Sequence, residues 1–396
     1  MQMRRALVLG AALVLAGASV ARAQASFGAI WGSGPGDVWV AGDASAALHF
    51  DGRAWIEVPF GVPLSGTINA LWGTGPRDVF AAGEGGMILR WNGQAWTRMT
   101  VPSDQQIVAL AGRTGSDVFA LVQSSSDRDP PTLLHWDGRT WSASALPMGF
   151  RANALVLQGA DVLVAGFVMA DPTPSERRVF GVLARRRAGQ WSLTGWNGKA
   201  VTDQVLAGGG WSRLYAAGTT LMLVGEQEGG ATVQALSTGA AWTLLPPAVS
   251  AMGGARVAFA FLGADRTPVA LNAGGGLERY AAGQWTAVVA ANPYAMAMQA
   301  QQNPQAIAQM NPEAMALQMM AWDLGDTQAA WGPSSNDFYA VMSNGRIVRV
   351  QGSAAAIVYD AACADPMQAS MNPVCRALLQ QQPQTPIPMP TRRPKP

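Results

Sequence analysis

The chain has 396 residues, of which 49% are hydrophobic and 13% are charged. Its 27 basic and 25 acidic residues give a formal net charge of +2, which is too little for the phosphate-neutralising surface of a nucleic-acid-binding protein. We therefore expect no nucleic-acid partner. The length exceeds one ordinary hydrophobic core, yet no linker divides it before the C-terminal tail. These properties predict one large repetitive domain.

Residues 1–23 have the pattern of a secretory signal peptide. Arg4 and Arg5 precede an apolar run, and a small-x-small cleavage sequence ends at Ala23. The apolar run of about 13 residues is shorter than the roughly 20 residues that span a bilayer. We expect cleavage near Ala23, a secreted or periplasmic location, and no transmembrane span in the mature chain.

A repeat begins directly after this segment. AIWGSGPGDVWVAGD at 29–43 returns as ALWGTGPRDVFAAGE at 70–84. Taking the Asp of this motif as a marker gives seven units with a period near 40 residues, which indicates a repeat architecture. Arg213 is interpreted as a substitute for the marker in the fifth unit. The seven markers are Asp37, Asp78, Asp117, Asp161, Arg213, Asp265 and Asp337.

Each unit is predicted to hold four short β-strands. In the second unit we expect them at 68–72, 79–83, 87–91 and 96–100, because aromatic and β-branched residues alternate there between glycine-rich turn sequences. Four strands in about 40 residues is typical of a propeller blade. A single blade cannot bury both faces of its sheet, so neighbouring blades must stack. We predict an all-β, seven-bladed propeller over residues 24–360.

Tryptophans also follow the repeat. Twelve of the 15 fall on repeat positions and are expected to lie in the core. Trp196, Trp211 and Trp322 fall outside the repeat and are candidates for contact with a ligand. Six of the repeat tryptophans are predicted to open fourth strands, namely Trp55, Trp96, Trp141, Trp191, Trp242 and Trp285.

At these residues the chain resembles bacterial exported β-propeller repeat proteins with the pattern W-G-x-G-P-x-D-V-W-x-x-G, then G-x-I-L, then D-G-x-x-W. These are akin to neuraminidase-type and photosystem II assembly-factor-like propellers. The resemblance runs from Ala29 to about Asp360 and implies a propeller in the periplasm, on the cell surface or in the medium that binds a partner. The neuraminidase motif S-x-D-x-G-x-T-W is not met, because HFDGRAW and HWDGRTW place Asp directly before Gly. This departure argues against sialidase activity.

No residue pattern indicates catalysis. The recurring Asp is expected to cap the first turn of each blade by accepting backbone N–H groups, in preference to forming a carboxylate ring for a metal. His49 and His135, the only histidines, occupy equivalent positions and lack a G-x-S-x-G context. Phosphate-binding and dinucleotide-binding glycine motifs are absent from the sequence. We expect no cofactor, no metal and no catalytic residue.

Residues 291–327 interrupt the repeat between the sixth and seventh units. Three Asn-Pro pairs each place an N-cap residue before a proline at the first helical position, so we predict a short Met-rich helical insertion. Its soft apolar side chains, among them Met315, Met319 and Trp322, suit adaptable docking to a partner. Packing on its own propeller and capture of Cu(I) by thioethers are the alternatives.

The C-terminal part contains both cysteines. Cys363 and Cys375 are predicted to form a disulfide, because an exported chain meets oxidising conditions and two isolated thiols are too few for structural zinc. The disulfide would close a segment at 361–379. The tail at 380–396 is rich in Pro and Gln and is expected to be disordered.

One face of the propeller is predicted to carry the function. We call it the link face: it bears the turns from second to third strands and the links between blades, including the irregular segments 122–131, 168–178 and 226–232. Because loops on a rigid scaffold commonly carry function, we predict that this face binds a protein in the cell envelope or outside the cell. A carbohydrate-binding or glycan-cleaving propeller, with a carboxylate pair about 5 to 10 Å apart, is the alternative. The predicted binding residues are Asp127, Arg128, Asp129, Glu176, Arg177, Arg178, Trp196, Glu226, Glu228, Met315, Met319 and Trp322.

Overall fold

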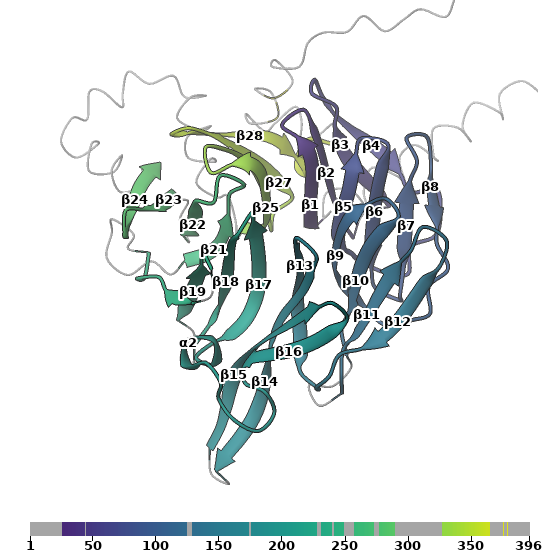
Figure 1. Cartoon of the computed structure of the whole chain (residues 1–396). Coiled ribbons are helices and arrows are strands. Elements are labelled where there is room, and N and C mark those ends of the chain that lie inside the picture. The colour runs from purple at the N-terminus through teal and green to yellow at the C-terminus, as the bar shows by residue number, and fades with distance from the viewer. Residues whose placement is uncertain are drawn as a thin grey trace, which may run out of the picture.

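The computed structural model shows a ring of seven four-stranded antiparallel sheets, each built from four consecutive strands. The first strand of each sheet lies nearest the centre of the ring (Figure 1). The predicted all-β, seven-bladed propeller is therefore confirmed. The residues that the structure describes are 26–43, 45–124, 129–173, 176–227, 231–239, 241–248, 257–272, 277–289 and 327–364, with Cys375 and Leu378.

The first four blades are formed by residues 27–195. Blades 1 and 2 consist of β1 (Phe27–Gly34), β2 (Asp37–Gly42), β3 (Ala46–Phe50), β4 (Trp55–Pro59), β5 (Ile68–Gly75), β6 (Asp78–Gly83), β7 (Ile88–Trp91) and β8 (Trp96–Arg98). Blades 3 and 4 consist of β9 (Ile107–Thr114), β10 (Asp117–Val122), β11 (Thr132–Trp136), β12 (Trp141–Ala145), β13 (Arg151–Gln158), β14 (Asp161–Thr173), β15 (Glu176–Arg187) and β16 (Gln190–Gly195).

The last three blades follow the same order. They consist of β17 (Gly210–Ala217), β18 (Thr220–Glu226), β19 (Thr232–Ser237), β20 (Thr243–Leu244), β21 (Val257–Leu262), β22 (Pro268–Asn272), β23 (Leu277–Ala281), β24 (Gln284–Val289), β25 (Thr327–Ser334), β26 (Asp337–Met342), β27 (Arg346–Gln351) and β28 (Ala354–Asp360).

Helix is a minor feature of the described residues. The short helix α2 (Gln204–Ala207) lies between blades 4 and 5, where Asp203 Oδ1 accepts a hydrogen bond from Leu206 N at 3.1 Å and so caps its first turn. A 3-10 turn (Ala361–Ala364) follows β28. The predicted Met-rich helical insertion gains no support, because residues 291–326 lie outside the described residues and Thr327 already begins β25. Among the described residues, no helix is long and apolar enough to cross a membrane.

The second strand of a blade is buried on both sides. Residues 38–41 of β2 and 79–82 of β6 have no exposed surface. A strand covered on both faces reads as a continuous apolar run, which explains sequences such as VWVA and VFAA. The fourth strands lie at the rim of the ring, and most residues of β4 and β8 are exposed to solvent.

Seven hydrophobic clusters of the described residues hold the ring together, one at each interface between neighbouring blades. At the first interface, Trp39 packs edge-on against Trp96 with 5.7 Å between ring centroids. Each fully buried side chain of this size stabilises the fold by about 1.5–3 kcal/mol. The repeated sequence therefore forms a similar apolar interface at each of the seven contacts between neighbouring blades.

The W-G motif forms part of these interfaces. The first-strand Trp of one blade lies against a glycine in the first strand of the next blade. A Cβ added at that glycine would come within 2.5 to 2.8 Å of the indole ring, so any larger residue would clash. The pairs are Trp31 with Gly73, Trp72 with Gly112, and Trp331 with Gly32.

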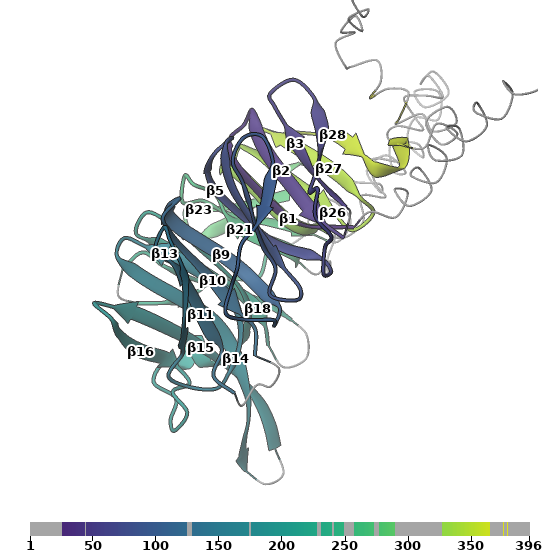
Figure 2. The ribbon, with the colours of Figure 1, turned by 90° about the vertical axis from the view of Figure 1, so that its right-hand side faces the viewer.

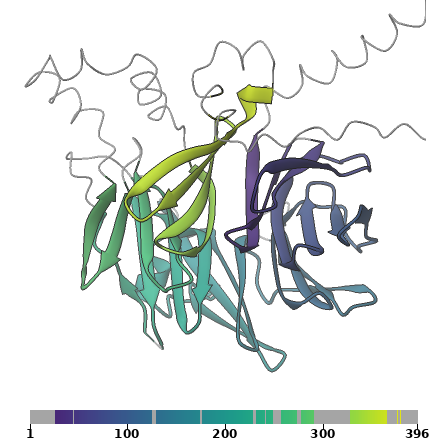
Figure 3. The ribbon, with the colours of Figure 1, turned by 90° about the horizontal axis from the view of Figure 1, so that it is seen from above.

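Blade 7 closes the ring against blade 1 without exchanging a strand (Figure 3). The contact is made by side chains: Trp331 lies on Gly32, and Tyr339 Oη donates a hydrogen bond to Pro35 O at 2.9 Å. Tyr339 also shares a buried cluster with Phe27 and Leu48 of blade 1. We call this contact between blades 7 and 1 the seam.

Candidate functional site

Five blades repeat an ion pair on the face opposite the link face. In each, the Asp that opens the second strand meets a basic side chain of the third strand. The hydrogen bonds that these carboxylates accept come from side chains, which corrects the prediction that they cap backbone N–H groups. The pairs are Asp37 with His49 (2.7 Å), Asp78 with Arg90 (2.8 Å), Asp117 with His135 (2.8 Å), Asp161 with Arg187 (2.7 Å) and Asp337 with Arg349 (2.9 Å).

The markers assigned to the fifth and sixth units are also corrected. Thr220, not Arg213, opens the second strand of blade 5. Asp265 lies in the turn before β22 and does accept a backbone hydrogen bond within that turn, from Thr267 N at 3.4 Å. It also accepts from Ser335 N at 3.1 Å and Ser335 Oγ at 2.6 Å, and these bonds join blade 6 to blade 7. Arg213 lies in β17, at the centre of the ring.

The two histidines are equivalent to arginines of other blades. His49 stacks on Trp39 with 4.0 Å between ring centroids, and the guanidinium of Arg90 lies over Phe80 at 4.9 Å. Since His and Arg make the same two contacts, with a carboxylate and an aromatic face, the pair serves blade stability. Within the part of the chain that the structure describes, no three His, Cys, Asp or Glu side chains are grouped so as to hold a metal ion.

The predicted binding residues are only partly placed. Six lie outside the described residues: Asp127, Arg128, Glu228, Met315, Met319 and Trp322. Asp129, Arg178 and Glu226 are exposed, at the ends of strands that lead to the link face. Glu176 begins β15 and pairs with Thr173 at the tip of a hairpin, with Arg177 beside it.

Two of the three tryptophans outside the repeat, Trp196 and Trp211, are described and have structural partners. Trp196 stacks on Phe180 with 4.8 Å between ring centroids and is half-buried against the cluster between blades 3 and 4. It begins the sequence WNGKAV, which repeats the WNGQAW turn of blade 2, and Asn197 Oδ1 accepts hydrogen bonds from two backbone N–H groups as Asn92 does. Trp211 is fully buried and donates to Leu206 O at 2.7 Å, so it belongs to the core.

The hairpin of β14 and β15 is the most prominent element on the link face. Its strands have 13 and 12 residues, and it projects beyond the rest of its blade (Figures 1 and 2). β13 pairs with β14 as far as Phe167, and β16 pairs with β15 only from Val182. Residues 168–173 and 176–180 therefore form a two-stranded ribbon, which we call the projecting ribbon. Met169 on this ribbon is 43% exposed.

A central channel, which the sequence did not reveal, runs between the first strands of all seven blades. Its cavity has a volume of about 280 Å³. Each first strand has a β-bulge near its start, where the pairing with the second strand skips one residue. First strands start at the link face, so the bulges surround the channel mouth on that face. Six residues at the bulges line the cavity, namely Gly28, Asn69, Val108, Asn153, Ser212 and Gln328.

Two of these bulge residues join neighbouring blades. Asn69 Nδ2 donates to Ile107 O of blade 3 at 3.2 Å, and Asn153 Nδ2 donates to Trp211 O of blade 5 at 2.9 Å. The bulges thus turn amide side chains toward the next blade and fix the width of the mouth.

The residue after each bulge breaks the sevenfold repeat. Five blades have alanine there, whereas blades 5 and 6 have Arg213 and Phe259. The guanidinium of Arg213 lies over the ring of Phe259, 4.4 Å from its centroid. A comparison of this position between the seven units of the sequence would have identified Arg213 and Phe259 as exceptions. The alanines are Ala29, Ala70, Ala109, Ala154 and Ala329.

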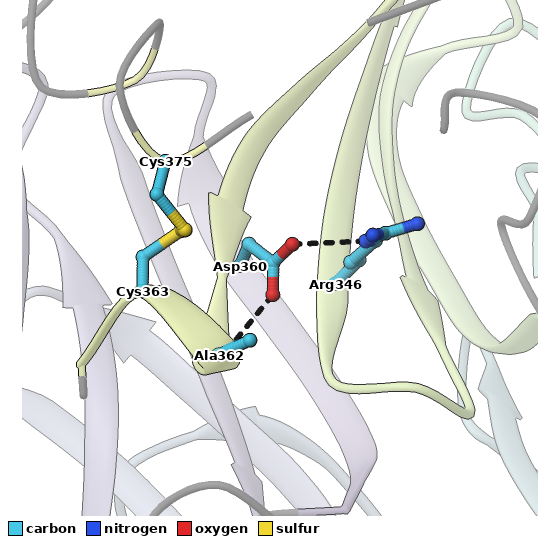
Figure 4. Close-up of a disulfide and its surroundings, with 5 residues drawn as sticks. All are labelled: Arg346, Asp360, Ala362, Cys363 and Cys375. Atoms are coloured by element: carbon cyan, nitrogen blue, oxygen red, sulfur yellow. Dashed lines mark hydrogen bonds and ion pairs between the residues drawn. A yellow bond between two sulfur atoms is a disulfide. The ribbon is translucent and has the colours of Figure 1, made fainter. Parts of the chain in front are cut away.

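A second cavity, of about 330 Å³, lies at the seam. Phe50 and Trp55 of blade 1 line it together with Tyr359 of blade 7 and both cysteines. The predicted disulfide between Cys363 and Cys375 is confirmed (Figure 4). The buried Asp360 anchors the preceding strand by accepting from Arg346 Nε at 3.0 Å and from Ala362 N at 2.9 Å. The described residues Cys363, Cys375 and Leu378 thus lie where the ring closes.

Comparison with known proteins shows the fold alone. No protein-family model and no curated protein sequence matches the chain. A structure of YCF48 bound to D1 peptide is similar with a TM-score of 0.52 and 10% identity, over 84% of this chain and 95% of that one. YCF48 from Cyanidioschyzon merolae gives 0.55 and 12%, over 83% and 96%. A GH74 xyloglucanase from Xanthomonas campestris gives 0.54 and 14%, over 83% of this chain and 52% of that one.

Proposed function

We propose that this protein is a non-enzymatic, exported propeller that binds a protein partner on its link face. The observation that carries the proposal is the projecting ribbon. Both outer edges of the ribbon extend past the strands that cover the rest of the blade, and no strand of the described residues pairs with them there. Such edges are templates for the addition of a strand from another chain.

The length of the ribbon and its exposed Met169 favour a partner over a purely structural role. Natural proteins place charges and prolines along exposed edges, as the sequence does here with Asp171, Pro172, Glu176 and Arg177, and they also keep such edges short. Here β14 and β15 are about twice the length of β10 and β11, and Met169 leaves a flexible thioether exposed. Exposed Met combined with a strand edge suits an adaptable protein contact.

Two further observations support the proposal. YCF48, a propeller of similar fold, has been solved bound to a D1 peptide, so a protein of this fold can bind a peptide. The disulfide between Cys363 and Cys375 fits an oxidising compartment outside the cytoplasm.

A glycan ligand is the competing proposal, because a GH74 xyloglucanase shares the fold. Its support is weaker, since the side chain of Trp196 that would stack on a sugar is already stacked on Phe180. A glycan array tests it directly. Binding of a sugar by the wild type that persists without the projecting ribbon would favour the glycan over the protein partner.

The test shortens the ribbon and leaves its base intact. Replacing residues 169–179 by Asn-Gly keeps the pair of Val168 and Phe180 and gives the strands a two-residue turn that they favour. The wild type and the variant are each used to capture proteins from a native envelope extract. We expect one protein to be enriched by the wild type and not by the variant. The melting temperature of the variant should stay near that of the wild type. The control is Arg139→Ser, an exposed change on the opposite face. Equal retention by all three baits would refute the proposal.

A further inference from the structure

The channel mouth on the link face contains a site independent of the proposed protein partner. Among the residues that line the cavity, Arg213 is the only charged one, and no carboxylate lies in this lining. Arg279, by contrast, has oxygen partners, since it donates to Ser335 O and Gly352 O at 2.8 Å. Arg213 is held by an aromatic face instead.

The repeat shows that Arg213 is not needed to build the ring. The equivalent residue is alanine in five blades, and all five blades form the same bulge and the same four-stranded sheet. Placing a long cation there costs side-chain entropy and leaves an ion in a narrow channel. Phe259 at the matching position of blade 6 supplies the surface on which the guanidinium lies, so the two exceptions to alanine act together.

Among the described residues, no oxygen accepts a hydrogen bond from the guanidinium of Arg213, so its hydrogen-bonding edge is available to a ligand. Stacking uses the π-face of the group, whereas its N–H donors lie in its plane. Tyr215, two residues along β17, also lines the channel, and burial raises the pKa of Tyr215 to about 12, so its phenol is neutral. The alanines at the equivalent position of five blades line the same cavity as this single positive charge.

We propose that Arg213 binds the carboxylate of a small organic acid in the channel mouth. The planar guanidinium matches a carboxylate with two parallel hydrogen bonds. The single positive charge of Arg213 lies among neutral groups and therefore balances the single negative charge of one carboxylate. It does not balance the two negative charges of a phosphate dianion. The cavity of about 280 Å³ restricts the ligand to a small molecule.

The test is calorimetric titration of the whole chain with acetate, succinate and inorganic phosphate at matched ionic strength. We expect the wild type to bind a carboxylate, with Arg213→Gln weakening it roughly tenfold or more because the bidentate pair is lost. Arg213→Lys keeps the charge without the planar fork and is expected to weaken binding several-fold. Arg139→Gln, on the exposed opposite face, should bind as the wild type does.

Three results would overturn the assignment: no carboxylate binding by the wild type, equal binding by the folded Arg213 variants, or tighter binding of phosphate than of either acid. If Arg213→Gln does not fold, Arg213→Lys decides between the outcomes. The ribbon variant separates this site from the proposed function, because replacing residues 169–179 should leave carboxylate binding unchanged.

Discussion

The paired carboxylates of the blades determine how the protein responds to acid. A hydrogen bond from Arg187 is the largest influence on Asp161 and lowers the pKa of this carboxyl. Burial alone would raise the pKa of Asp37, but hydrogen bonds from His49 and Ser33 outweigh it and the pKa is lowered. A carboxyl with a lower pKa in the folded state stabilises the fold fully above its unfolded pKa of about 3.9. That contribution is lost as the pH falls through the folded pKa.

Asp161→Asn tests whether this paired carboxylate makes the stability of the fold depend on pH. We expect the free energy of unfolding of the wild type to be flat above about pH 4 and to fall below it, with a shallower fall in the variant because one paired carboxylate no longer titrates. Urea unfolding between pH 2.5 and 7 measures the slope. Asp104→Asn, at an exposed carboxylate, should keep the slope of the wild type. Identical slopes for all three proteins would show that the pair at Asp161 does not contribute.

At the scale of the strand, the contact between tryptophan and glycine fixes how closely blades approach. A Cβ at Gly73 would lie 2.6 Å from Asp78 O and 2.8 Å from the Trp31 ring, whereas one at Gly75 would meet nothing within 4 Å. The two glycines of one W-G-x-G motif therefore have different roles. The first is required by packing, and the second only shapes the chain.

Gly73→Ala is expected to lower the free energy of unfolding by about 1–3 kcal/mol, because the neighbouring blade must shift. Gly75→Ala in the same strand should change it by less than about 0.5 kcal/mol. Chemical denaturation of both variants measures the difference. Equal effects would mean that the indole does not confine the glycine.

The strand pattern was largely predictable from residues, and the site was not. Turn sequences around Asp78 and Asn92 placed the strands of blade 2 within a few residues of β5 to β8. The partner of the recurring Asp was missed, because a carboxylate at a turn also suits backbone capping, and only the fold brings His49 or Arg90 across the sheet. Arg213 was misassigned because spacing alone cannot distinguish a first strand from the start of a second.

At the scale of the whole molecule, closure of the ring depends on side chains at the seam. Among the described residues, no strand is exchanged between the first and last blades, and blades 7 and 1 meet through side chains such as Trp331 and Tyr339. Cys363 and Cys375 line the second cavity together with Phe50 and Trp55 of blade 1. We therefore expect the disulfide to strengthen the seam, the interface that is formed last along the chain.

Removal of the disulfide by Cys363→Ser with Cys375→Ser should lower the free energy of unfolding by about 3 kcal/mol in the chain-entropy account. Dithiothreitol should lower the melting temperature of the wild type and leave that of the double variant unchanged. Scanning calorimetry with and without reductant measures both effects. A double variant as stable as the oxidised wild type would show that the segment does not support the seam.

The proposal that the link face carries the function is tested most directly by site-specific photo-crosslinking. A benzophenone side chain is placed at Met169 on the projecting ribbon and, separately, at Arg139 on the opposite face. In the native envelope, we predict that irradiation joins the first protein to one defined partner, identified by mass spectrometry, and that the second gives no such product. A partner joined equally from both positions, or only from position 139, would contradict the account.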